Sequence, residues 1–356
     1  MHEHDFKLLK ELVEAPSPSG YEQPAQRIIR RELEPLADLL ETDVMGNVIA
    51  RIRADRDDAP RVMLAGHCDE IGFMVKYIDE QGFIYFAPIG GIDPHLVPGQ
   101  RVHIHTARQP LLGVIGKKPI HMIETKDRDT VLKLKQLFID IGSSSRAETE
   151  ELLAVGDPIT FAVGLERLGG DRVTSRALDD KMGAYIITRV LRNLHARGAS
   201  PVELIGVSTV QEEVGLRGGA TSVYGIKPDV GIAVEVGFAT DYPEMDKKDI
   251  GHIKIGGGPI IGRGPNINPV LFRLLLETAR AEGIPCQVMA APRATGTDAN
   301  VMQLSRGGVA TALVSVPLRY MHTPVELLSL TDLEHTVQLL TAVLDKIDNK
   351  AMFIPN

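Results

Sequence analysis

The feature that most constrains the fold of this chain is a buried strand that leads into two adjacent glutamates. Val202 to Thr209 is short, apolar and β-branched and follows the turn signal Gly198-Ala199-Ser200-Pro201, which predicts a buried β-strand. Ligands collect at the carboxyl ends of strands in open α/β sheets. Of the two glutamates that follow, Glu212 and Glu213, one could bind a metal ion while the other moves a proton for a metal-bound water. An isolated Glu-Glu pair is more often a solvated loop, so the decision depends on the rest of the chain.

Further strands of the same kind predict an α/β fold. Buried strands are expected at Arg61 to Gly66, at Asp229 to Val236 and at Ala310 to Val316. Segments with helical spacing lie between them, and a closing helix has its apolar residues at steps of three and four from Leu330 to Ile347.

Residues 71–164 consist mostly of short β-like pieces separated by turns, without the helix–strand alternation of the rest of the chain. This pattern predicts a small β-rich domain inserted into the α/β domain. Helix–strand alternation resumes afterwards, so the α/β domain is expected to comprise residues 1–70 and 165–356. The insertion also holds a charged segment, Glu124 to Lys135. Its short β-like pieces, separated by glycine and proline turns, are Phe83 to Ala87, Gln100 to His105, Gly113 to Ile115 and Pro158 to Phe161.

Composition excludes several classes of partner. The chain has 356 residues, 44% of them hydrophobic, which allows one large domain or a large domain with a smaller one. A net charge of −8 without a basic stripe argues against nucleic acid. No apolar run approaches a membrane span, and the first residues lack a signal-peptide pattern. Only Cys68 and Cys286 are present, so no disulfide framework exists and a cytoplasmic location is expected.

Five potential metal ligands are expected at or just beyond the ends of strands, and one sheet edge could gather them all. They are His67, Asp179, Glu213, Glu235 and His322. Two histidines and three carboxylates suit a pair of divalent ions, such as zinc, cobalt or manganese, with one carboxylate bridging. Glu212 would then be the general base.

Local context supports two of the assigned residues. A carboxylate inside the buried run Ile232 to Val236 must be paired or bind a metal, which favours a function for Glu235. If strand alternation persists past Gly66, His67 and Asp69 share a face. The Asp69 carboxylate can then accept the second ring N–H of the histidine.

Several polar residues have an ordinary structural interpretation when each is considered alone. Aspartates at a helix start are most often caps, and this applies to Asp179 and Asp180 before the five potential ligands are considered together. Cys68 is expected to be a small core residue. Three lone histidines of the insertion, His95, His103 and His105, are expected to be ordinary surface or core residues. The role of His121 is left open.

The order and spacing of five motifs carry a family resemblance. The motifs are His67-Cys68-Asp69-Glu70-Ile71-Gly72, Leu178-Asp179-Asp180-Lys181, Gln211-Glu212-Glu213-Val214-Gly215, Gly296-Thr297-Asp298-Ala299 and Arg319-Tyr320-Met321-His322-Thr323-Pro324-Val325-Glu326. With them the chain resembles, along nearly its whole length, the M42 family of metallo-aminopeptidases. This family groups tetrahedral, glutamyl and deblocking aminopeptidases, and some members carry the label endoglucanase M.

The resemblance implies a zinc-peptidase-like fold, with a central mixed sheet flanked by helices. It implies two divalent ions per subunit, Zn²⁺ or Co²⁺ before Mn²⁺. Asp179 would bridge them, His67 and Glu235 would complete one site, and Glu213 and His322 the other. Glu212 would be the base, and Asp69 would orient His67. The inserted domain would serve subunit association in a homo-oligomer, with a closed twelve-subunit shell favoured. Many members carry aspartate at the Glu235 position.

The function predicted from these observations is a metal-dependent exopeptidase that removes N-terminal residues from peptides. One alternative is a metal-dependent deacylase or amidohydrolase acting on N-acylated amino acids or blocked peptides. A glycanase would need aromatic platforms, but the chain has no tryptophan and only 4% aromatic residues. A binding module would have no use for a free glutamate beside the ligands.

Overall fold

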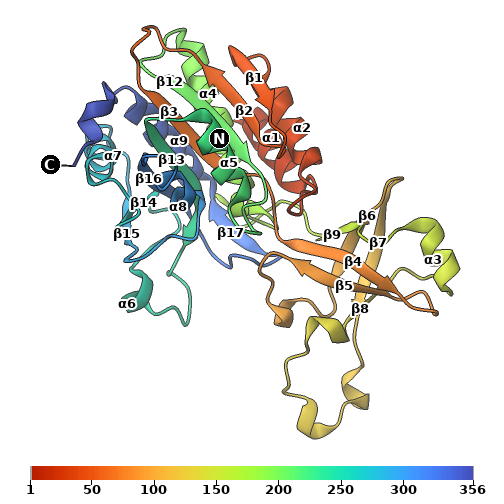
Figure 1. Ribbon diagram of the computed structural model, residues 1–356. Coiled ribbons are helices and arrows are strands. Elements are labelled where there is room, and N and C mark those ends of the chain that lie inside the picture. The colour runs from red at the N-terminus through yellow and green to blue at the C-terminus, as the bar shows by residue number, and fades with distance from the viewer. Residues whose placement is uncertain (1, 356) are drawn as a thin grey trace.

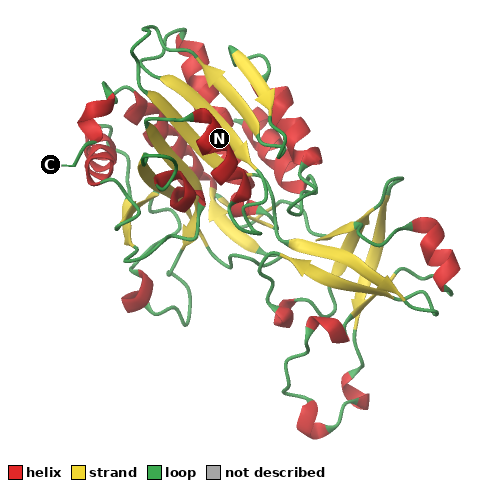
Figure 2. Cartoon of the chain, in the orientation of Figure 1, coloured by secondary structure: helices red, strands yellow, loops and turns green. Residues whose placement is uncertain are grey.

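The protein, seen in a computed structural model that describes residues 2–355, has a large α/β body from which a smaller β-barrel projects (Figure 1). Helices cover the sheet of the body, whereas the barrel is mostly strand and loop (Figure 2). Among the described residues, no helix combines the length and the hydropathy that a membrane span requires. The predicted fold class is confirmed.

The body is built on a mixed eight-stranded sheet. In spatial order its strands are β1 (Leu39–Thr42), β2 (Val48–Ile52), β12 (Glu203–Thr209), β3 (Arg61–His67), β13 (Val230–Phe238), β16 (Ala310–Leu318), β14 (Ile260–Arg263) and β15 (Gln287–Ala290). The four central strands β12, β3, β13 and β16 are parallel, so their carboxyl ends meet at one edge. The strands β2 and β14 pair with this group in antiparallel fashion.

Helices pack on both faces of this sheet. On one face lie α1 (Glu3–Glu14), α2 (Gln23–Leu33), α4 (Leu178–Arg197), α7 (Pro269–Ala281) and α9 (Leu330–Leu344), and on the other lie α5 (Arg217–Ile226) and α8 (Asp298–Gln303). A Cβ on Gly206 would meet Leu191 of α4, whereas one on Gly231 would meet Met302 of α8. Strand alternation therefore tells which face each side chain of the central strands occupies. The short α6 (Lys247–Ile250) lies in a loop.

The inserted segment forms a closed barrel with its own hydrophobic core. Around the barrel the strands are β4 (Gly72–Ile78), β5 (Ile84–Ile89), β8 (Phe138–Asp140), β7 (Pro110–Gly116), β6 (Arg101–His105) and β9 (Pro158–Phe161). The helix α3 (Arg146–Leu152) and a long excursion with short 3₁₀ turns, residues 117–136, are attached to it. All barrel strands lie within the range 71–164 that the sequence suggested. The sequence did not predict β4 and β8.

A separate three-stranded sheet adjoins two of the segments that carry predicted ligands. Its strands are β10 (Glu166–Arg167), β11 (Arg172–Ser175) and β17 (Glu326–Ser329). The strand β11 leads into α4, and β17 follows the turn that carries His322. Two predicted ligand segments are thus attached to this small sheet.

Candidate metal centre

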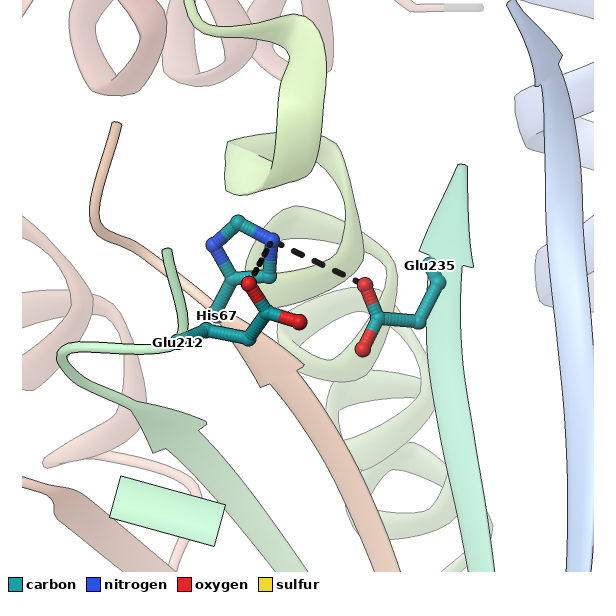
Figure 3. A group of neighbouring side chains, drawn as sticks. All are labelled: His67, Glu212 and Glu235. Carbon is teal, nitrogen blue, oxygen red and sulfur yellow. Dashed lines mark ion pairs between the residues drawn. The ribbon is translucent and has the colours of Figure 1, made fainter. Parts of the chain in front are cut away.

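Two adjacent strands of the main sheet direct one side chain each to the same point. His67 is the last residue of β3, and Glu235 lies inside β13. Ala233 pairs with Ala65 in the parallel register, so positions 67 and 235 share the face that carries α8. The His67 Nε2 atom lies 3.6 Å from a Glu235 oxygen and 3.8 Å from an oxygen of Glu212, which follows β12 (Figure 3).

Asp179 reaches the cluster from the start of α4. The backbone at Asp179 and Asp180 is not helical, and the peptide bond between them is cis. The expected capping role is wrong for both aspartates, because no side chain caps the start of this helix and the Asp180 carboxylate accepts from the backbone N–H of His67 instead. Gly66 and Gly183 allow α4 to approach β3 closely, since a Cβ on Gly66 would lie 2.7 Å from the Gly183 backbone.

The Asp179 carboxylate lies between the two histidines. One of its oxygens is 3.3 Å from the His67 Nε2 atom, and the other is 3.4 Å from the His322 Nε2 atom. A Glu213 oxygen lies 3.3 Å from the same nitrogen of His322. The five predicted ligands therefore lie in one cluster, with Asp179 at its centre.

The geometry allows more than one division of these ligands between ions. Single ligand atoms of His67, Glu212 and Glu235 lie within 4.8 Å of one another, as do those of His67, Asp179 and Glu213. Glu212 therefore lies as close to the possible ion positions as some of the predicted ligands do. Distance alone does not decide whether Glu212 is a metal ligand or a general base, so the two roles must be separated by a chemical test.

The prediction that every ligand sits at the end of its own strand is only partly right. It holds for His67 and for the loops after β12 and β16, which carry Glu213 and His322. Asp179 also lies just past the end of a strand, β11, but this strand belongs to the small sheet, so the expectation of a single sheet edge is wrong for it. The expectation of a strand end is wrong for Glu235, which is followed by three more residues of β13. Helix α4 can also approach β13 closely because Gly183 has no side chain, since a Cβ there would lie 2.4 Å from the Val234 carbonyl oxygen.

Asp69 is buried, and it positions both the His67 ring and the loop that carries Glu212 and Glu213. Its carboxylate lies 3.5 Å from the His67 Nδ1 atom, but that nitrogen is closer, at 3.1 Å, to the Asp69 carbonyl oxygen. The carboxylate accepts hydrogen bonds from the backbone N–H groups of Glu212 and Glu213 and from the Ser19 hydroxyl. Asp69 therefore fixes the imidazole and the adjacent glutamates relative to each other.

The barrel also contributes to the site. The carbonyl oxygen of Gly91, in the loop after β5, lies 2.9 Å from the His322 Nδ1 atom. This contact leaves the Nε2 atom of His322 free to face the cluster. His95 and His121 of the insertion are exposed, and His103 and His105 are half-buried. None of these four belongs to a group of potential ligand atoms found in the described residues.

Three buried acids that the sequence reasoning did not assign hold the ligands in place. Glu326 accepts hydrogen bonds from the backbone N–H groups of Asp179 and His322, and Asp180 accepts one from that of His67. At the start of α8, the N–H of Asp298 donates to Glu235. All three acids lie within the motifs that carry the family resemblance, but nothing in the pattern distinguishes a positioning carboxylate from a ligand.

Comparison with known proteins decides the family. The model of the M42 glutamyl aminopeptidase family matches residues 46–339. The chain belongs to the M42 family. A lysyl aminopeptidase from Pyrococcus furiosus is 39% identical, over 96% of this chain and 97% of that protein. The resemblance seen in the sequence is thereby confirmed, and the chain is a peptide hydrolase of a metal-dependent aminopeptidase family.

Solved structures agree with this assignment. A TET aminopeptidase from the marine sediment archaeon Thaumarchaeota archaeon SCGC AB-539-E09 has a TM-score of 0.93 and 32% identity, covering 98% of both chains. The TET1 peptidase of Pyrococcus horikoshii, which can assemble into a tetrahedron or a large octahedral shell, has a TM-score of 0.85 and 31% identity. The match covers 96% of this chain and 99% of that chain.

The metal centre brings together more carboxylates than its two imidazoles can neutralise, so ionisation of some of these carboxylates is disfavoured. Burial raises the pKa of Glu235 well above its usual value, and neighbouring carboxylates add to the rise. Burial also raises the pKa of Glu212 to about 8, although the charge on His67 opposes it. Burial lowers the pKa of His322, but hydrogen bonds to Asp179 and Glu213 outweigh it and raise the value to about 11. Crowded carboxylates with two imidazoles are a donor set that divalent cations fit and neutralise.

A second buried cluster of charges lies between the metal centre and the end of α1. The Glu70 carboxylate accepts hydrogen bonds from Arg176 and Lys181, and also from the backbone N–H of Ser17. Lys181 donates in addition to the carbonyl oxygen of Val13. This cluster ties the end of α1, the turn after β3 and the start of α4 together.

Low pH should reduce the contribution of the Glu70 ion pairs to the free energy of unfolding. Burial alone would raise the pKa of Glu70, but Arg176 and Lys181 hold it at about 2 instead of 4.5. Because the folded-state value is the lower one, the stabilising contribution is complete above the unfolded-state value and disappears as the pH falls through the folded-state value. The free energy of unfolding of the wild type should therefore fall more steeply between these values than that of Glu70→Gln, by up to about 1.4 kcal/mol per pH unit.

Urea unfolding at a series of pH values measures these slopes. The exposed Glu166 provides a control variant, Glu166→Gln, whose slope should match the wild type. Equal slopes for Glu70→Gln and the wild type would show that the cluster does not hold Glu70 ionised.

A cavity of 520 Å³ opens beside the metal centre. The predicted ligands and Glu212 form part of its lining. The remainder comes from β13, β15, β16 and the loops before α5 and α8, and is mostly apolar. The cluster therefore faces a space large enough for the end of a peptide.

Proposed function

We propose that this M42 protein is a binuclear metal-dependent aminopeptidase that removes N-terminal residues from peptides, with Glu212 as the general base. The observation that carries the proposal is the position of Asp179, whose two carboxylate oxygens each lie 3.3–3.4 Å from a different histidine. A carboxylate that faces two imidazoles in opposite directions is suited to bridge two cations.

The division of ligands between the two ions is the one that the family resemblance implies, and the observed contacts are compatible with it. His67 and Glu235 would hold one ion, Glu213 and His322 the other, and Asp179 both. Imidazole with carboxylate favours zinc or cobalt, and manganese also fits. When bound, such a pair of ions would polarise the scissile carbonyl and lower the pKa of the attacking water.

Glu212 has the position and chemistry of a proton carrier. It lines the cavity, and Asp69 holds its backbone N–H. Burial raises the pKa of Glu212 to about 8, and bound cations would lower it toward working pH. The Glu212 carboxylate would take a proton from the attacking water and return it to the leaving amine of the peptide. His322 and His67 would be held by Gly91 and Asp69 throughout.

A substrate panel tests this function. Aminoacyl-anilides should be hydrolysed after metal addition, and the activity should disappear with a chelator. Acetylated amino acids and cellulose should not be turned over. Cellulose hydrolysis that survives the chelator would refute the proposal.

The same panel examines the deacylase alternative, which the longer side chain of Glu235 motivates. If the wild type cleaves only acetylated substrates while Glu235→Asp gains activity on free amino termini, the deacylase alternative replaces the aminopeptidase proposal. Glu235→Asp is a matched change because it removes one methylene and keeps the charge.

We also propose that residues 71–164 form the association domain and that the protein is a closed twelve-subunit shell in the cytoplasm. The barrel exposes large apolar side chains on β4 and β7, namely Tyr77, Leu112 and Val114, and such groups favour a subunit contact. The assemblies of the TET1 peptidase support the shell. Sedimentation should give a dodecamer for the wild type and a smaller species for Leu112→Asp. A wild-type monomer at micromolar concentration would contradict this.

A further inference from the structure

The floor of the cavity is a single row of residues that runs across the sheet away from the metal centre. Leu313 of β16 pairs with Ala233 of β13, and Met289 of β15 pairs with Gly262 of β14. A Cβ on Gly262 would lie 3.3 Å from that of Leu313, so Gly262 continues the row between Leu313 and Met289. Because alternate residues share a face, this row lies on the same side of the sheet as Glu235.

The cavity extends along this row for more than the length of a large side chain. Met289 lies three strands beyond β13, which is roughly 14 Å at a strand spacing of about 4.8 Å. Leu313 and Met289 both line the cavity, and Gly262 between them adds no side chain of its own.

The walls offer no free opposite charge to a charged group, and apart from the metal centre and Glu212 their polar side chains are the hydroxyls of Thr295 and Thr297. Phe238, Val236, Leu216 and Met321 complete the apolar lining, and none of the cavity-lining residues in the described chain is a lysine or an arginine. Arg293 lies in the loop that carries Ala291 and Ala294 but does not line the cavity. The acidic residues of the lining are those of the metal centre and Glu212, whose charges two divalent ions would balance.

We infer that this cavity receives the side chain of the substrate's N-terminal residue and selects large neutral side chains, such as those of leucine, methionine and phenylalanine, over acidic and basic ones. The inference rests on the proposed aminopeptidase function. An apolar pocket discriminates by roughly 10- to 200-fold for each missing methylene, so alanine should be a poor substrate. A charged side chain would be buried without a partner and should be rejected more strongly still.

The test compares kcat/KM for leucyl-, methionyl-, alanyl-, glutamyl- and lysyl-p-nitroanilide on the metal-loaded protein. Leucyl and methionyl substrates should exceed alanyl by at least about tenfold. They should exceed the glutamyl and lysyl substrates by about a hundredfold or more, because a polar group left unpaired in a pocket costs that much selectivity.

Two variants on neighbouring positions of β15 locate the selecting surface. Met289→Arg introduces a cation into the floor and should lower the leucyl-to-glutamyl ratio by at least about tenfold. Val288→Arg, on the exposed face of the same strand, should leave the ratio unchanged. Equal ratios in the two variants would overturn the assignment of the floor.

Binding separates a failure of this inference from a failure of the proposed function. Calorimetric titration with free leucine, methionine, glutamate and lysine, the products of the reaction, needs no turnover. Tighter binding of leucine and methionine supports the inference even if no anilide is hydrolysed, which would refute only the aminopeptidase function. Fastest hydrolysis of the glutamyl or lysyl substrate, or tightest binding of glutamate or lysine, overturns the inference and leaves the aminopeptidase function standing.

Discussion

Replacing Glu212 by glutamine is expected to lower kcat by about two to four orders of magnitude while the protein keeps its metal ions. The amide has nearly the same shape as the carboxylate but cannot accept the proton of the attacking water. Glu212 is not one of the proposed metal ligands, so the variant should still bind the cations. Steady-state kinetics and elemental analysis of the same preparation measure both quantities.

The adjacent glutamate provides the matched control for this prediction. Glu213→Gln should lose part of the bound metal, because a Glu213 oxygen lies 3.3 Å from the same His322 nitrogen that faces Asp179. If Glu212→Gln loses metal and Glu213→Gln keeps it, the roles of the two glutamates must be exchanged. This outcome is a real alternative, because Glu212 also lies within 4.8 Å of the ligand atoms of His67 and Glu235.

Replacing Asp179 by alanine is expected to remove both ions and abolish measurable activity. The reason is that its two oxygens face the two histidines separately, so each ion loses a ligand and the charge that opposes their repulsion. His322→Ala removes a ligand from one ion only and should retain more metal than Asp179→Ala. Elemental analysis after gel filtration in metal-free buffer gives the ion-to-chain ratios.

Circular dichroism must show that both variants are folded. This check is needed because Asp179 begins the buried helix α4 and its N–H is bonded to Glu326. Equal metal content in the two folded variants would mean that Asp179 does not bridge.

Sequence reasoning located the four central strands of the body well because their residues are apolar on both faces. The strand around Val207 and the strand β13 are buried along almost their whole length, and short apolar, β-branched runs between turn signals are typical of such strands. The barrel was less predictable. The strand β4 begins directly after the polar His67–Glu70 motif and exposes Lys76 and Tyr77, and β8 has only three residues.

For the site, the sequence indicated which residues could meet, but not the backbone that brings them together. Asp179 and Asp180 have the pattern of helix caps, but their backbone is not helical, and the close approach of Gly66 to Gly183 together with the bond from the Asp179 N–H to Glu326 holds this segment at the cluster. The role of Glu326 depends on two backbone N–H groups, one of them 147 positions away in sequence. No periodicity encodes such a contact.

Whether Asp179 bridges two cations can be seen by anomalous diffraction at the zinc edge from crystals of the wild-type protein soaked in zinc. We expect two peaks about 3.5 to 4 Å apart, one on each side of the Asp179 carboxylate, the first bonded to His67 and the second to His322. A single peak, or two peaks of which neither is bonded to Asp179, would contradict this expectation.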